Sequence, residues 1–166
     1  MLTICDLKRN FGPIQAVRGV SFTVEKGEVL GFLGPNGAGK STTMRMITGF
    51  LPPTSGTAMI CGFNILETPV EAKRCLGYLP ENAPSYGNMR VEEFLEFIAA
   101  IRGYRGDERR QRVDAAIEKS RLQTVRHRRI EALSKGFRQR TCFAQAILHD
   151  PPVLIMDEPT DGLDPN

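Results

Sequence analysis

The chain has 166 residues, of which 41% are hydrophobic and 25% charged, a composition typical of one globular domain and not of a disordered or fibrous protein. No apolar run approaches the roughly 20 residues that a membrane-spanning helix needs. The net charge of +3 is too small to indicate a nucleic acid or an anionic membrane as partner. Because the amino terminus has no signal-peptide pattern, we expect a cytoplasmic protein.

The four cysteines are far apart in the sequence and include no C-x-x-C pair: Cys5, Cys61, Cys75 and Cys142. This spacing disfavours a zinc site and, in a reducing compartment, a disulfide framework. We therefore expect the cysteines to be buried as small apolar residues.

The first half of the chain has the pattern of an α/β protein. Residues 2–7 and 20–24 are predicted strands, and the continuous apolar run 29–33 predicts a buried parallel strand. A glycine-rich stretch follows, and then residues 40–48 predict a helix that ends at Gly49. A turn at 52–56, a strand at 57–61, a short helix from Pro69 and a strand at 77–79 complete this part.

The middle of the chain is predicted to be helical. Residues 91–102 and 107–121 carry apolar side chains at i, i+3 and i+4 spacing. Between Arg102 and Arg140 there are 13 Arg or Lys and five Asp or Glu, so the basic excess of the chain lies here. This excess indicates either a solvated helical face or a partner-binding surface. A helix at 135–148 and a buried strand at 153–156 follow.

A phosphate-binding motif stands between the predicted strand 29–33 and the predicted helix 40–48. The motif fits G-x-x-x-x-G-K-[ST], and Thr42 follows it. Its residues are Gly34, Pro35, Asn36, Gly37, Ala38, Gly39, Lys40 and Ser41. Glycines allow the backbone N–H groups to turn inward as an anion cradle at the helix N-terminus. Lys40 supplies a charge for the β- and γ-phosphates of ATP, and Ser41 an oxygen for Mg²⁺. The alternative is a structural glycine turn before a helix.

Two carboxylates follow the apolar strand 153–156, where open α/β sheets bind their ligands. Asp157 suits a metal ion, bound directly or through water. Glu158 suits a general base that polarises a water molecule against the γ-phosphate.

A third motif resembles one family, the nucleotide-binding subunits of ABC transporters. The stretch from Leu133 to Arg140, L-S-K-G-F-R-Q-R, is similar to the family's signature L-S-G-G-Q followed by R-Q-R, and residues 157–164 resemble its Walker B motif and D-loop. The resemblance implies an α/β P-loop NTPase with a RecA-like core, an antiparallel β subdomain and a helical insertion that bears the signature. It further implies a single domain, incomplete at its carboxyl end: a β subdomain with the P-loop core in 1–85, a helical subdomain in 86–140, and the rest of the core in 141–166.

The resemblance also implies roles for individual residues. Phe11 would stack on adenine, although it can instead pack beneath a loop. Ser134 and Gly136 would contact the γ-phosphate held by a second subunit, and Ser134 is also a predicted helix N-cap. Lys40, Glu158 and Asp164 would be catalytic; Ser41, Glu81 and Asp157 would hold the metal.

The chain departs from the family pattern in three ways. Glu81 stands where the Q-loop usually has glutamine, and Lys135 and Phe137 replace a glycine and the glutamine of the signature. This combination resembles bacterial ABC ATPases of export, antibiotic-resistance and gliding-motility systems. The family's switch histidine follows the D-loop, whereas His127 and His149 precede Walker B. We therefore expect an amino-terminal fragment of a longer subunit that folds marginally and does not turn over ATP alone.

The function implied is an ATPase that powers a transporter, with ATP and Mg²⁺ as cofactors. Two ATP-binding subunits, identical or different, would close on two ATP molecules and move transmembrane permease subunits. The helical insertion and residues 78–89 would contact these permease subunits, and an apolar groove is expected beside the Glu81 loop. The subunit would lie on the inner face of the membrane, and no nucleic acid is expected. The alternatives are a soluble ABC-type ATPase acting on nucleic acid and a regulatory protein that binds nucleotide without turnover.

Overall fold

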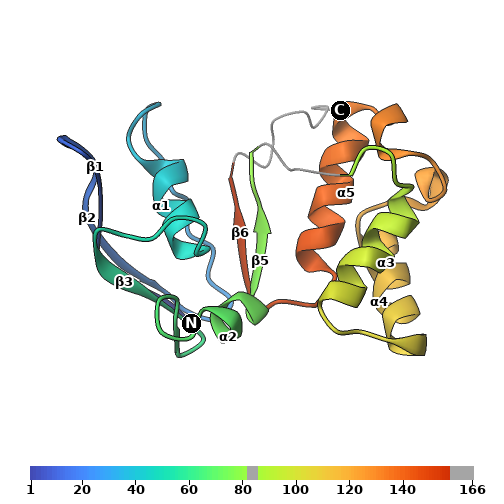
Figure 1. Cartoon of the computed structure of the whole chain (residues 1–166), viewed down its shortest axis with the longest axis horizontal. Coiled ribbons are helices and arrows are strands. Elements are labelled where there is room, and N and C mark those ends of the chain that lie inside the picture. Colours follow the sequence, from blue (N-terminus) through green and yellow to red (C-terminus); the bar gives the residue numbers. More distant parts are fainter. Residues whose placement is uncertain (82–85, 158–166) are drawn as a thin grey trace. The chain divides into compact units, whose positions relative to one another are not determined.

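A computed structural model describes residues 1–81 and 86–157, which form two compact units (Figure 1). The first unit is Met1–Leu76, and the second contains the described residues from Gly77 onward. Strands and helices are mixed in both, as in the α/β P-loop NTPase fold that the motifs predict. The finer division at residues 85 and 140 stays a prediction.

The first unit is built on an antiparallel sheet with the strand order β2-β1-β3-β4. The strands are β1 (Leu2–Phe11), β2 (Ile14–Val24), β3 (Ser55–Ile60) and β4 (Phe63–Asn64). Leu2, Ile4 and Leu7 of the central strand β1 are buried, so one face of the sheet carries the core. The antiparallel β subdomain is therefore confirmed, and its first two strands are longer than the predicted segments 2–7 and 20–24.

Two short helices belong to the same unit. The helix α1 (Lys40–Ile47) contacts β1 and β2 and buries Met46 and Ile47, and α2 (Pro69–Arg74) contacts β4. Proline at the first position of α2 suits a helix start because its missing N–H would have no partner there. Both helices are confirmed close to their predicted bounds.

The prediction of a buried parallel strand at 29–33 is wrong for the described structure. These residues have no regular secondary structure, and the side chains of Val29 and Leu33 are 95% exposed. Phe32 lies against the sheet, with its ring 5.9 Å from that of Phe22 on β2. The physical reason is that a strand needs a hydrogen-bonded neighbour, and no strand of the described residues pairs with this run.

The second unit contains a two-stranded sheet of β5 (Leu76–Leu79) and β6 (Val153–Met156). The N–H of Asp157 donates to the carbonyl of Leu79 at 2.9 Å, so both strands end at the same edge. Both strands lie where the sequence predicts them.

Three helices form the rest of the second unit and lie side by side in Figure 1: α3 (Val91–Ile101), α4 (Gly106–Lys119) and α5 (Lys135–Ile147). Two 3-10 turns, Gln123–Val125 and Ile130–Ala132, connect α4 to α5. The apolar faces of the three helices meet in one core, which confirms the helical insertion. Its buried residues are Val91, Phe94, Leu95, Ala99, Val113, Ala116, Ile117, Leu122, Val125, Ile130, Leu133, Ala144 and Leu148.

The expectation that all four cysteines are buried is correct only for Cys142, where burial raises the pKa of the thiol to about 11. Cys61 and Cys75 are half-buried, and Cys5 is exposed. Cys5 directly follows the buried Ile4 on β1, so strand alternation places its side chain on the face of the sheet opposite to the core.

Candidate nucleotide-binding site

The phosphate loop lies in the first unit, directly before α1. Gly37 and Gly39 have φ angles of +83° and +89°, a left-handed conformation that side chains disfavour. A Cβ on Gly39 would lie 2.5 Å from the carbonyl oxygen of Ala16. Gly39 is therefore required both by its conformation and by the close approach of the loop to β2.

The ammonium group of Lys40 contacts the backbone of the phosphate loop. Its Nζ donates to the carbonyls of Gly34 at 2.6 Å and Pro35 at 3.1 Å. The N–H of Ala38 donates to Pro35 at 3.1 Å, and the N–H of Thr43 donates to Gly39 at 2.8 Å. The loop is thus a closed turn with an ammonium group held against it, an arrangement that suits an anion.

The start of α1 has the electrostatics of an anion site. Its first turn has no acidic residue, so the positive end of the helix dipole is not neutralised there. Ser41 and Thr42 lie in this turn and are half-buried. A hydroxyl at the helix start is a hard oxygen donor, which fits Mg²⁺ bound together with phosphate.

Phe11 ends β1 in the same unit, and its side chain is 45% exposed. The guanidinium of Arg9 lies 4.6 Å from the centre of the ring. Arg9 is itself held by a 2.7 Å hydrogen bond to the carbonyl of Pro52. The Phe11 ring is therefore partly exposed and stacked against the Arg9 guanidinium, and its adenine role stays a prediction.

The predicted metal residues of the second unit lie at one edge of its sheet. Asp157 directly follows β6 and is buried, with 3% of its surface exposed. Glu81 follows β5, which ends at the same edge, and is exposed. A buried carboxylate at this edge is a hard oxygen donor that fits a divalent cation. Glu158 and Asp164 lie outside the described residues.

The signature residues form the start of α5 in the second unit. Ser134 is the N-cap, and its Oγ accepts a hydrogen bond from the N–H of Phe137 at 3.4 Å, which confirms the predicted cap. Ser134 and Lys135 are exposed, and Gly136 is half-buried. Phe137 packs against the helical core, so the ring that replaces the signature glutamine has a packing role.

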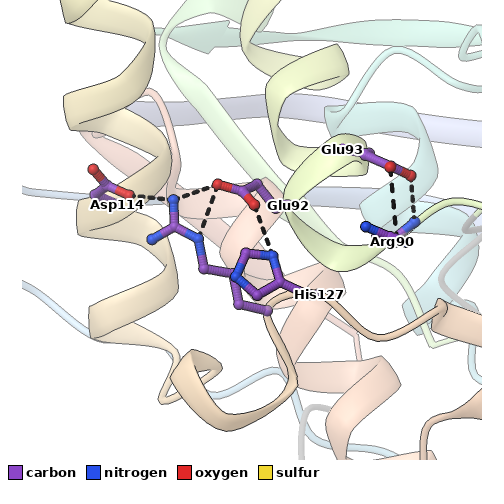
Figure 2. A network of polar contacts seen from close by, with 6 residues as sticks. Arg90, Glu92, Glu93, Asp114 and His127 are labelled. Atoms are coloured by element: carbon purple, nitrogen blue, oxygen red, sulfur yellow. Dashed lines mark hydrogen bonds and ion pairs between the residues drawn. The ribbon is translucent and has the colours of Figure 1, made fainter.

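An ion-pair network joins α3, α4 and the segment after the first 3-10 turn, and sequence analysis missed it (Figure 2). Glu92 of α3 pairs with Arg126 and accepts from His127 Nδ1 at 3.0 Å, and Arg126 also reaches Asp114 of α4 at 2.8 Å. The hydrogen bond from Arg126 lowers the pKa of the Glu92 carboxyl. Glu92 and Arg126 are 34 residues apart, so no local pattern indicates their pairing.

The comparisons with known proteins agree with these motifs. The family model described as ABC transporter matches residues 17–161, most of the chain. The chain belongs to the ABC transporter family. Its fold is that of the family's ATP-binding cassette, and ABC cassettes bind ATP or ADP.

Relatives and a solved structure extend this likeness. The "Probable multidrug ABC transporter ATP-binding protein YbhF" of Escherichia coli K12 is 39% identical over 160 residues, which are 96% of this chain and 28% of YbhF. The "ABC transporter ATP-binding protein NatA" of Bacillus subtilis is 38% identical over 99% of this chain and 69% of its own length. The structure titled "Dimeric Structure of MJ0796, a Bacterial ABC Transporter Cassette" superposes with a TM-score of 0.87 at 25% identity, over 99% of this chain and 76% of that one.

Proposed function

We propose that this chain binds Mg-ATP and hydrolyses it, paired with a second ATP-binding subunit, to drive transport through membrane partners. The observation that carries the proposal is the phosphate loop of the first unit, where Lys40 is held against a closed turn that has Gly37 and Gly39 in left-handed conformations. Membership of the ABC transporter family and the likeness to multidrug and other transporter ATP-binding proteins support it.

In this proposal the loop residues carry the binding of the triphosphate. The backbone N–H groups of the loop bind the phosphate oxygens, and Lys40 exchanges its two carbonyl partners for the β- and γ-phosphates. Phe11 orients the base by stacking. The set of loop residues is Gly34, Pro35, Asn36, Gly37, Ala38, Gly39, Lys40, Ser41 and Thr42.

The metal and the attacking water are assigned to oxygen donors. Ser41 and Asp157 would hold Mg²⁺, with Glu81 as the Q-loop ligand. When bound, this cation neutralises charge on the phosphates. Glu158 would take a proton from the attacking water, and Asp164 of the D-loop would support the partner site.

A second ATP-binding subunit is proposed because Ser134 and Gly136 stand at the exposed start of α5. The Ser134 cap accepts the N–H of Phe137, and the positive end of a helix dipole favours an anion such as a phosphate brought by the partner. The bacterial ABC transporter cassette MJ0796, whose structure is dimeric, supports such pairing.

Membrane partners are proposed to contact the second unit at an aromatic surface formed by Tyr86 and Phe97. Their rings meet edge to face with centroids 5.5 Å apart, and their side chains are 55% and 38% exposed. Ile101, 66% exposed, extends this apolar surface along α3. No helix of the described residues is long and apolar enough to cross a membrane. Attachment to the inner face of the membrane would therefore depend on the permease subunits.

The test is Mg-ATP binding and hydrolysis by the full-length polypeptide. We expect Lys40→Ala to lose nucleotide binding, and Lys26→Ala, which changes an exposed lysine in the turn after β2, to match the wild type. Glu158→Gln is expected to bind ATP and to accumulate as a dimer without turnover. Wild-type binding without turnover would contradict the ATPase proposal and favour a regulatory nucleotide-binding protein.

A further inference from the structure

The end of β1 carries an arginine that lies on the face of an aromatic ring. The guanidinium carbon of Arg9 is 4.6 Å from the centre of the Phe11 ring. Phe11 is nevertheless 45% exposed. Because the guanidinium covers one face of the ring, the exposed surface is the opposite face and the ring edge. A flat apolar surface of this kind suits a planar aromatic ligand.

Arg9 is itself held in place by the segment that precedes β3. Its Nη1 donates a hydrogen bond to the carbonyl of Pro52 at 2.7 Å. Its Nε is buried and has no hydrogen-bond partner among the described residues, so the attraction to the Phe11 ring offsets part of the cost of burying this N–H. The guanidinium is thus fixed between a carbonyl and a ring, and it restricts the ring in turn.

The segment that holds Arg9 is tied both to β1 and to α1. The N–H of Thr54 donates to the carbonyl of Lys8 at 2.8 Å, and the hydroxyl of Thr54 accepts the N–H of Asn10 at 2.9 Å. At the other end of the segment, the N–H of Leu51 donates to the carbonyl of Arg45 in the last turn of α1, at 3.1 Å. A chain of hydrogen bonds therefore connects the ring to the helix that begins at the phosphate loop.

We propose that Arg9 is a positioning residue for the base of the nucleotide: it covers one face of the Phe11 ring and keeps the other face presented to adenine. This role rests on the proposed function, in which Phe11 stacks on adenine, and it adds a residue that does not itself touch the base.

Two physical effects would make the held ring a better surface for stacking. A side chain that is already restricted loses less conformational entropy when a base binds to it. The cation also draws electron density of the ring towards its own side, which weakens the repulsion between the π faces of the ring and the base. Arg9 is therefore expected to strengthen the binding of the base and to leave the binding of the phosphates unchanged.

Inorganic triphosphate separates this role from a general effect of charge or of stability, because it carries the phosphates of ATP and no base. The experiment measures the Kd of Mg-ATP and of magnesium triphosphate for the full-length polypeptide by isothermal titration calorimetry. We expect Arg9→Ala to weaken ATP binding about fivefold to tenfold and to leave the Kd of triphosphate unchanged.

A double-mutant cycle tests whether Arg9 acts through the ring. Phe11→Ala is expected to weaken ATP binding at least as much as Arg9→Ala does, because it removes the stacking surface itself. Adding Arg9→Ala to Phe11→Ala should then have no further effect on the Kd of ATP. A further loss of the same size in the Phe11→Ala background would overturn the proposal.

Two other variants control for charge and for folding. Arg9→Lys keeps the charge and the aliphatic stem but lacks the planar guanidinium, so its Kd for ATP should lie closer to that of Arg9→Ala than to the wild type. This variant provides the same test if Arg9→Ala does not fold. Arg18→Ala, which removes an exposed arginine of the neighbouring strand β2, should bind both ligands as the wild type does. Far-UV circular dichroism checks the folding of each variant.

The outcomes distinguish failure of this role from failure of the proposed function. An unchanged Kd of ATP in Arg9→Ala, or equal losses of affinity for ATP and triphosphate, would overturn the role of Arg9 while nucleotide binding by the wild type stands. A wild type that binds neither ligand would contradict the proposed function and the role of Arg9 with it.

Discussion

At the scale of single residues, the phosphate loop depends on one glycine for two physical reasons. Gly39 has a φ of +89°, and a Cβ there would also overlap the carbonyl oxygen of Ala16. Gly12, in the turn between β1 and β2, shares the left-handed conformation at +57° but would meet nothing within 4 Å. Comparing the two glycines separates backbone strain from steric exclusion.

We expect Gly39→Ala to destabilise the chain by about 3 kcal/mol or more, because left-handed strain of about 1–2 kcal/mol adds to an overlap with backbone that cannot move freely. Gly12→Ala should cost only the strain, about 1 kcal/mol. Urea unfolding of both variants measures the difference. Equal losses of unfolding free energy in the two variants would show that the close approach of Gly39 to β2 adds nothing to the cost of the substitution.

At the scale of elements, the helical core is stabilised by apolar packing and by a polar network at its surface. Glu92, Arg126, Asp114 and His127 join α3, α4 and the segment after the first 3-10 turn (Figure 2). The Glu92 side chain is 24% exposed, so its interactions are only partly screened by solvent. The network therefore adds a pH-dependent contribution to the stability of this part.

The sign of that dependence follows from the lowered pKa of Glu92. Its stabilising contribution is complete above the ordinary glutamate pKa of about 4.3 and is lost as pH falls through the lowered folded-state pKa. We expect Glu92→Gln to cost about 1 kcal/mol at pH 7 and progressively less below pH 4.

Unfolding midpoints measured from pH 3 to pH 7 test this expectation. Glu96→Gln, one turn further along α3, is the matched control and should shift the midpoint by less than half as much. A cost of Glu92→Gln that stays constant across the whole range would contradict the assigned role of the carboxylate.

The apolar part of the same core supports a second prediction. Leu122 is fully buried between α4 and the first 3-10 turn, so Leu122→Ala should destabilise the chain by about 3 kcal/mol through lost burial and a cavity. Ile101→Ala removes a side chain that is 66% exposed and should cost well under 1 kcal/mol. Thermal unfolding compares them, and similar shifts for the two variants would argue against the assigned core.

At the scale of the whole molecule, the chain combines two compact units with an apolar run that no described strand covers. Val29 and Leu33 are 95% exposed, although both belong to the segment that leads into the phosphate loop. An unpaired apolar segment of this kind is a template for association with another chain. The exposed run is therefore expected to promote self-association of this chain.

We expect the double change Val29→Ser with Leu33→Ser to raise severalfold the concentration at which the 166-residue chain begins to associate, because it removes the exposed apolar surface of the run. Static light scattering against protein concentration measures this onset. The matched control, Ile14→Ser with Val70→Ser, removes two apolar side chains that are 66% and 57% exposed elsewhere and should change the onset little. The same onset for both doubles would contradict a special role of the run.

The chemistry-bearing motifs were predictable from sequence because their requirements are local. A glycine with positive φ, a lysine at a helix start and a serine N-cap act on neighbours within a few residues, so Gly39, Lys40 and Ser134 are recognisable by spacing alone. The helices were predictable for a similar reason, since their apolar residues recur about every 3.6 residues and this spacing can be recognised within a few turns.

Only the tertiary structure decided which distant segments meet. An apolar run such as 29–33 has the pattern of a strand, but whether it becomes one depends on a hydrogen-bonding neighbour that its own residues do not specify. The pairing of Glu92 with Arg126 likewise depends on chain packing across 34 residues. Local sequence determines the chemistry that each segment can perform, and long-range packing determines which groups act together, because side chains far apart in sequence interact only after the backbone has brought them into contact.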